Sequence, residues 1–80
     1  MWKEEHKTLT RTFKFKNFSQ AFSFMTQVAI EAEKLNHHPN WSNEYNVVII
    51  NLSTHDADNT ITEKDRKLAK AIDCLLEDVG

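Results

Sequence analysis

Glycine is almost missing from this chain of 80 residues, which has one, and that one is the last residue. Glycine-rich phosphate loops, Rossmann fingerprints and P-loops all need internal glycines, because their backbone must approach a phosphate closely. The sequence therefore excludes these nucleotide-binding motifs.

Cysteine, long apolar runs and excess positive charge are also scarce. The single cysteine, Cys74, excludes an intramolecular disulfide and indicates a reducing compartment. No apolar run approaches the roughly 18 residues of a membrane span, and the N-terminus has no signal-peptide core. A net charge of −2 argues against a nucleic-acid surface, which needs a basic stripe. We therefore expect a cytoplasmic protein that binds no membrane and no nucleic acid directly.

The composition that is present fits one globular domain over residues 1–80. Hydrophobic residues make up 40% and charged residues 28%, which is typical of a folded domain. A chain this short builds a single core and buries a modest share of its surface, so oligomerisation is a common source of added stability.

Three stretches have the pattern of β-strands. Residues 2–5 form a short candidate, and residues 8–16 alternate apolar and polar side chains with a period of two. Residues 41–54 form the strongest one. Its two faces carry Tyr45, Val47 and Ile49 on one side, and Val48, Ile50 and Leu52 on the other. Apolar residues on both faces predict cover on both sides. Two helices more naturally cover one side, so we expect a second subunit to cover the other.

Asn17, followed three residues later by Gln20, predicts the capped start of a helix of about five turns. Its predicted apolar stripe comprises Phe18, Ala21, Phe22, Met25, Val28, Ala29, Ala32 and Leu35. Phe24 falls off this stripe, which predicts a second contact surface. Asn36 is expected to end the helix, and Pro39 keeps the residue before it out of helical conformation.

A second helix is expected after a polar loop over residues 56–60. Thr62 is a predicted cap, with Asp65 at the third position, where a carboxylate accepts from free amide hydrogens. The predicted apolar face comprises Leu68, Ala69, Ile72, Leu75 and Leu76. The order is strand, strand, helix, long strand or strand pair, helix, which predicts an α+β fold with an antiparallel sheet.

Three histidines, His37, His38 and His55, are the main candidates for chemistry. Imidazole both takes and gives a proton near neutral pH, so two or three such rings suit a reaction with paired proton transfers. A straight strand over residues 41–54 would hold its ends far apart, at about 3.3 Å per residue. For the three rings to meet, the segment must fold back over residues 43–46.

Each of these residues also has a purely structural interpretation. The His-His-Pro run fits a solvated turn, His55 a strand end, and Asp65 a helix cap. Trp41 and Tyr45 fit packing rather than ligand stacking. A metal site built from the histidines and Asp56 is disfavoured, because adjacent histidines seldom both bind one ion and no His-x-x-x-His spacing is present. We predict no metal.

The joint spacing carries more information than any single residue. His37-His38-Pro39, five residues, Tyr45, nine residues, His55, nine residues and Asp65 closely resemble the signature of the pterin-4a-carbinolamine dehydratases. Other residues also resemble this family, namely Phe13-Lys14-Phe15, Glu33-Lys34, Asn36, Trp41, Leu52-Ser53-Thr54-His55 and Lys67-Leu68-Ala69-Lys70. The resemblance runs from Trp2 to about Leu76. One departure is Asp58-Asn59, where members often carry glycine.

The resemblance implies a β-β-α-β-β-α fold, with helices on one face of a four-stranded antiparallel sheet, and dimers that pair into tetramers. It implies dehydration of 4a-hydroxytetrahydrobiopterin (pterin-4a-carbinolamine) to quinonoid dihydropterin and water. This reaction recycles the pterin cofactor of aromatic amino acid hydroxylases. It needs histidine acid-base chemistry, and no metal, redox cofactor or covalent nucleophile.

By the same resemblance, the expected catalytic residues are His37, His38, His55 and Asp65, with His38 the first candidate for the essential group and Asp65 orienting a histidine. The expected substrate-binding residues are Asn36, Pro39, Trp41, Thr54 and Asp56. A non-catalytic interaction module, as a dimerisation partner of a transcription factor or an assembly chaperone, is the alternative. The three histidines favour the enzyme, since an interaction module has no physical need for them.

Overall fold

Two β-hairpins alternate with two long helices in the computed structural model, which describes residues 2–79 and the side chains as far as Leu76. The elements in chain order are β1 (Lys3–Glu5), β2 (Thr8–Lys14), α1 (Phe18–Lys34), β3 (Asn40–Glu44), β4 (Val47–Leu52), the 3-10 helix η1 (His55–Ala57) and α2 (Glu63–Val79). This order confirms the predicted α+β fold.

Both hairpins turn through residues in the left-handed backbone region. His6 and Lys7, with φ of 51° and 63°, join β1 to β2. Tyr45, with φ of 51°, lies in the β3–β4 turn, where the Asn43 side chain donates a hydrogen bond to the Tyr45 carbonyl at 3.2 Å. The strong strand signal over residues 41–54 therefore comes from two strands folded back on each other.

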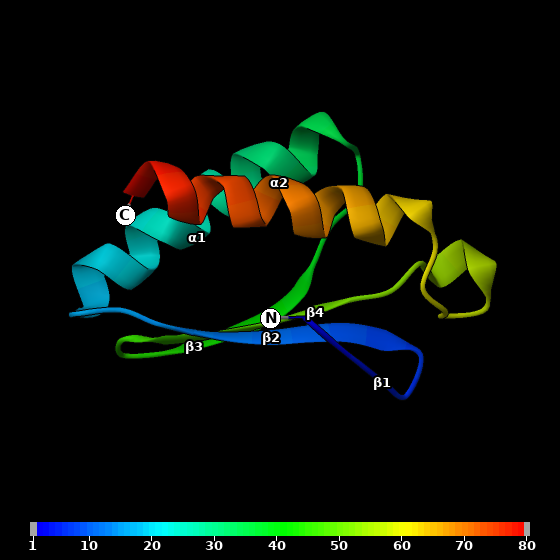
Figure 1. Ribbon diagram of the computed structural model, residues 1–80, viewed down its shortest axis with the longest axis horizontal. Coiled ribbons are helices and arrows are strands. Elements are labelled where there is room, and N and C mark those ends of the chain that lie inside the picture. The colour runs from blue at the N-terminus through cyan, green and yellow to red at the C-terminus, as the bar shows by residue number, and fades with distance from the viewer. Residues whose placement is uncertain (1, 80) are drawn as a thin grey trace.

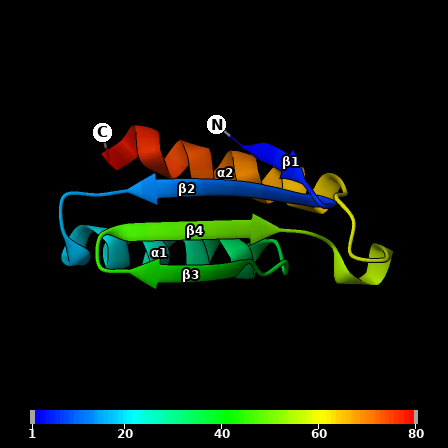
Figure 2. The same cartoon turned by 90° about the horizontal axis from the view of Figure 1, so that it is seen from below.

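The four strands form one antiparallel sheet in the order β1-β2-β4-β3. Figure 1 shows both helices on the same side of this sheet. Figure 2, seen from below, shows α1 behind β3 and β4, and α2 behind β1 and β2. The predicted arrangement, with helices on one face, is confirmed. Within residues 2–79, no helix is both long and apolar enough to cross a membrane.

The core lies between the helices and the sheet. It comprises Leu9, Phe13, Ala21, Phe24, Val28, Ala32, Val48, Ile50, Leu52, Leu68, Ala69 and Ile72. The strand faces follow the pleat, in which successive side chains alternate sides. Ile50 is fully buried, whereas its neighbour Ile49 is 37% exposed on the opposite face. This chain alone does not cover both faces of β4, and a second subunit over the open face stays a prediction.

The apolar stripe predicted for α1 is confirmed for Ala21, Val28 and Ala32, which are buried, but it is wrong for the phenylalanines. Phe24, assigned to a second surface, is 2% exposed, and its ring lies 4.9 Å from that of Phe13. Phe18 and Phe22, assigned to the core, are 48% and 55% exposed and stack on each other. The helix has two adjoining apolar faces, and packing against the sheet selects the face that carries Phe24.

The ends of α1 agree with the prediction. The Asn17 side chain accepts a hydrogen bond from the Gln20 backbone N–H at 2.9 Å. Asn36 has a left-handed φ of 51°, and the His37 N–H returns to the Ala32 carbonyl at 3.0 Å. This is the hydrogen bond of a Schellman motif, in which Asn is one of the residues that tolerate the left-handed position. The end of α1 thus fixes the backbone position of His37, the first of the three histidines.

Candidate functional site

The end of α1, the end of β4 and the start of α2 meet around one hollow of about 290 Å³. The hollow is lined by Asn36, His37, His38, Ser53, Thr54, His55, Asp56 and Lys64. The fold thus gathers all three predicted histidines, which the sequence separates by up to eighteen positions. Folding of residues 41–54 into a hairpin makes this possible, because β4 brings His55 back toward the end of α1.

His37 is the most firmly held of the three rings. Its Nε2 lies 2.5 Å from Oδ1 of Asp65, and the two side chains are 11% and 0% exposed. The prediction that Asp65 caps α2 is confirmed by the same carboxylate, since its Oδ2 accepts from the Thr62 backbone N–H at 2.8 Å. Asp65 therefore serves both as a helix cap and as the partner of a histidine in the hollow.

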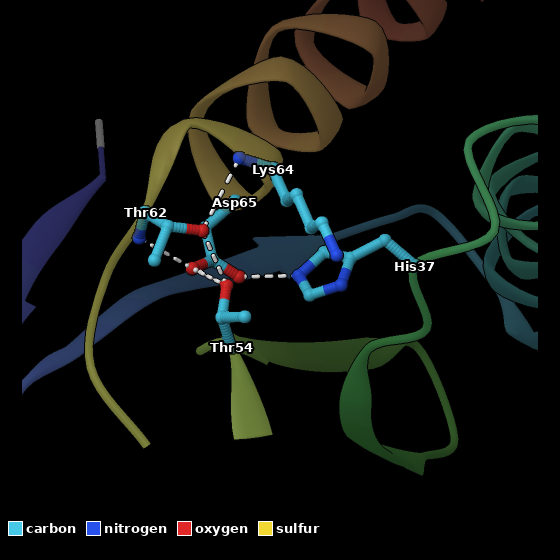
Figure 3. Close-up of polar contacts among 5 residues, drawn as sticks. All are labelled: His37, Thr54, Thr62, Lys64 and Asp65. Carbon is cyan, nitrogen blue, oxygen red and sulfur yellow. Dashed lines mark hydrogen bonds and ion pairs between the residues drawn. The ribbon is translucent and has the colours of Figure 1, made fainter. Parts of the chain in front are cut away.

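Two threonine hydroxyls complete the surroundings of Asp65 (Figure 3). Thr54 donates from Oγ1 to Asp65 Oδ2 at 2.8 Å, and its Oγ1 lies 2.5 Å from Oγ1 of Thr62. Thr62 Oγ1 also accepts from the Lys64 backbone N–H at 3.3 Å. A fully buried carboxylate is costly unless hydrogen bonds satisfy it, and this one has three donors.

His38 has a different setting, although it is the next residue. Its Nε2 lies 2.7 Å from Oε1 of Glu33, and these side chains are 61% and 77% exposed. His55 begins η1, and its Nδ1 lies 3.0 Å from Oδ1 of Asn59. Asp58 and Asn59 both have left-handed φ values, 64° and 56°. This explains why glycine suits these two positions and why Asp and Asn, which tolerate that region, replace it here.

Each histidine thus gives one ring N–H to a protein oxygen. A carboxylate or an amide oxygen accepts and does not donate, so Nε2 of His37, Nε2 of His38 and Nδ1 of His55 carry hydrogen. Among the residues with described side chains, the second nitrogen of each ring has no hydrogen-bond partner. These nitrogens are available to a ligand in the hollow, which is the arrangement that proton transfer requires.

The other predicted site residues divide into two groups. Asn36, Thr54 and Asp56 line the hollow, but Pro39 and Trp41 are not among its lining residues. Trp41 lies on β3 and packs against the core instead. In the part of the chain with described side chains, no three His, Cys, Asp or Glu side chains are grouped so as to hold a metal ion.

The sequence interpretation missed three residues at the site. Ser53 and Lys64 line the hollow, and the Thr62 hydroxyl contacts Thr54. Ser53 and Lys64 each adjoin a residue that was singled out, and Thr62 was itself predicted as a helix cap, so position along the chain was the available signal. Neither spacing nor composition shows which way a side chain turns.

The chain is similar to known proteins over almost its whole length. The family model described as pterin 4 alpha carbinolamine dehydratase matches residues 1–75. A Christiangramia forsetii protein provisionally named pterin-4-alpha-carbinolamine dehydratase is 51% identical over 76 residues, which cover 95% of this chain and 77% of that protein. A Rhodospirillum rubrum protein with the same provisional name is 60% identical over 68 residues, which cover 85% of this chain and 70% of that protein.

Two solved structures share the fold. One is described as a transcriptional coactivator/pterin dehydratase from Brucella melitensis, with a TM-score of 0.85 and 48% identity over 91% of this chain and 79% of that one. The other is a pterin dehydratase-like protein described as a RuBisCO assembly factor in the alpha-carboxysome. It has a TM-score of 0.78 and 27% identity over 92% of this chain and 87% of that one.

Proposed function

Since the chain belongs to the pterin-4-alpha-carbinolamine dehydratase family, we propose that it dehydrates a 4a-hydroxytetrahydropterin to the quinonoid dihydropterin and water. The observation that carries this proposal is the hollow in which three histidines each keep one ring nitrogen available. Its volume of about 290 Å³ lies near the lower end of ligand pockets, about 300–1,000 Å³, which suits a compact bicyclic substrate.

The reaction consists of two proton transfers and one bond cleavage. A base removes the proton from N5 of the pterin, the N5 electron pair forms the N5–C4a double bond, and the C4a–O bond breaks. An acid protonates the departing hydroxyl, which leaves as water. One proton is taken and one is given, so a set of neighbouring imidazoles balances the step.

His37, His38 and His55 are proposed to share this work. Asp65 orients His37 through Nε2, which leaves Nδ1 of that ring for proton exchange. His38 is exposed at the rim and has an available Nδ1, and His55 has an available Nε2. The reaction would recycle the pterin cofactor of aromatic amino acid hydroxylases, and the working form is proposed to be a homodimer or homotetramer.

Stopped-flow ultraviolet absorbance of chemically made 4a-hydroxytetrahydropterin tests the proposal. Wild-type protein should speed the decay, and His38→Ala should lose about 10²–10⁴-fold of that rate if His38 is a general acid or base. His6→Ala is the matched control, because His6 lies exposed in the β1–β2 turn and is not among the residues that line the hollow. Decay no faster than in buffer, from folded wild-type protein, would overturn the dehydratase.

A protein-interaction role is the second candidate, alone or beside the enzyme. The relatives described as a coactivator and as an assembly factor raise it, and the exposed, stacked rings of Phe18 and Phe22 on α1 supply an apolar surface. An assembly function without catalysis would depend on these two phenylalanines and would survive His38→Ala. A catalytic function would instead be lost in His38→Ala and would not depend on the two phenylalanines.

A further inference from the structure

We infer that the hydroxyls of Thr54 and Thr62 form a one-way hydrogen-bond chain that sets Asp65 and, through it, holds His37 as the tautomer with hydrogen on Nε2. Both threonines are thereby positioning residues. The catalytic consequence rests on the proposed dehydratase function, whereas the tautomer itself does not.

The direction of the chain follows from counting hydrogens. A hydroxyl has one hydrogen, and that of Thr54 goes to Asp65 Oδ2 at 2.8 Å, since a carboxylate only accepts. Thr54 Oγ1 must then accept in its 2.5 Å contact with Thr62, so Thr62 is the donor. Thr62 Oγ1 in turn accepts from the Lys64 backbone N–H at 3.3 Å. The order is Lys64 N–H, Thr62 hydroxyl, Thr54 hydroxyl, Asp65.

The contact between the two threonines goes beyond helix capping. A capping hydroxyl needs only to accept from an N–H of the first turn, which Thr62 does toward Lys64. Its hydrogen is free to point to solvent in an ordinary cap. Here it is directed to Thr54, which is 6% exposed and, although it is the N-cap residue of η1, makes no capping hydrogen bond with its side chain. The first turn of α2, at the positive end of the helix dipole, therefore polarises hydroxyls that converge on the carboxylate.

The hydrogen-bond chain leaves the Asp65 carboxylate with one orientation. Oδ2 has two donors, the Thr54 hydroxyl and the Thr62 backbone N–H, so Oδ1 is the oxygen that faces His37. Asp65 is fully buried and has no solvent as an alternative partner. His37 must then donate from Nε2.

Proton exchange on His37 is thereby assigned to Nδ1. That nitrogen has no hydrogen-bond partner among residues 2–76, and this part of the chain has no buried side-chain nitrogen or oxygen without one. Nδ1 is therefore accessible, on a ring that lines the hollow. The Thr54 hydroxyl points away from any ligand, toward Asp65, although Thr54 lines the hollow.

Long-range ¹H–¹⁵N correlation spectra of the histidine rings test the assignment directly. Wild-type His37 should show a protonated Nε2 and an unprotonated Nδ1. Thr54→Val keeps the β-branched shape and removes one donor to Oδ2. The Asp65 carboxylate is then free to turn away from Nε2 of His37, so His37 should populate both tautomers. Thr54→Ser restores the hydroxyl and should restore the single tautomer. Wild-type His37 with hydrogen on Nδ1 instead would overturn the inference, whatever the activity of the protein.

Rates of pterin dehydration supply the second readout. Thr54→Val should lower kcat about tenfold, as the loss of a residue that orients an active-site group does, with KM nearly unchanged. Thr54→Ser should recover most of the loss, and Thr62→Val should show a smaller decrease. Thr12→Val, an identical change at an exposed position of β2, is the control and should match wild type.

The outcomes separate the two proposals. A folded Thr54→Val protein that keeps the wild-type tautomer and kcat would overturn the inference, and so would a raised KM with unchanged kcat, which marks direct contact with substrate. If Thr54→Val does not fold, Thr62→Val and the wild-type spectrum decide. A wild-type protein without dehydratase activity but with His37 in the expected tautomer would refute the proposed function and leave the hydrogen-bond chain intact.

Discussion

His37 and His38 are adjacent in sequence, and each places Nε2 within 2.7 Å of a carboxylate, yet their surroundings differ. The His37 and Asp65 side chains are 11% and 0% exposed, and Asp65 has two further donors. The His38 and Glu33 side chains are 61% and 77% exposed, and the Glu33 carboxylate accepts no other hydrogen bond from the residues with described side chains. One pair is built into the core, and the other lies in solvent.

A short distance alone therefore does not make a contact between a histidine and a carboxylate important. An exposed pair gains little, about 0–1 kcal/mol, because water and salt screen it and both side chains lose rotamer freedom. A buried carboxylate that loses a donor is left with an unmet hydrogen-bonding requirement, which is far more costly. The two pairs should therefore respond very differently to the same substitutions.

The largest expected effect comes from Asp65→Asn. The Asn side chain keeps the shape of Asp65 but has an NH2 group in place of one carboxylate oxygen. This NH2 group must face either the Nε2–H of His37 or the two donors that Oδ2 of Asp65 accepts from. We expect His37 to shift to the tautomer with hydrogen on Nδ1 and kcat to fall about 10²–10⁴-fold, as in catalytic triads with the same change. Stopped-flow rates and the ¹⁵N spectrum check this. An unchanged tautomer would contradict the assigned role of Asp65.

The next effect is on stability. His37→Ala removes the donor on Asp65 Oδ1 and should lower the free energy of unfolding by about 1–3 kcal/mol. The matched His38→Ala should change it by less than about 0.5 kcal/mol, as surface substitutions usually do. Urea denaturation followed by circular dichroism measures both. Equal destabilisation by the two variants would remove the distinction between the pairs.

The smallest effect is that of salt. Raising the ionic strength to about 1 M shortens the Debye length to about 3 Å, which weakens exposed pairs and leaves buried ones almost unchanged. The ring ¹⁵N shifts of His38 should move toward those of a free histidine, whereas those of His37 should stay constant. Salt titration in the NMR spectrometer shows this without any substitution. A larger shift for His37 than for His38 would contradict the burial assigned to it.

Much of the fold could be predicted because local signals agree with one another. The Asn17 cap, the Asn36 terminator and the period-two strands all appear where expected. The hairpin over residues 41–54 was predicted only on the condition that the three histidines meet and from the family resemblance, because the apolar pattern alone left one long strand or a strand pair open. The rotation of α1 could not be predicted, because its apolar residues span two adjoining faces and only packing against the sheet selects between them.

The candidate site was predicted in part for a related reason. The chemistry of imidazole named the histidines, the family resemblance added Asp65, and these residues do meet at one end of the sheet. The choice of partners could not be read from the sequence. That His37 rather than His38 contacts Asp65, and that two threonine hydroxyls support the contact, depends on side-chain rotamers and burial, which arise only in the assembled fold.

The most direct test compares Asp65→Asn with Glu33→Gln in one stopped-flow assay of 4a-hydroxytetrahydropterin decay. Both substitutions turn the carboxylate that partners a histidine into an amide of the same shape. We expect Asp65→Asn to lose at least about 10²-fold in rate, whereas Glu33→Gln should stay within about twofold of wild type, because its pair is exposed. Equal losses from the two variants, or a full rate from folded Asp65→Asn protein, would contradict this expectation.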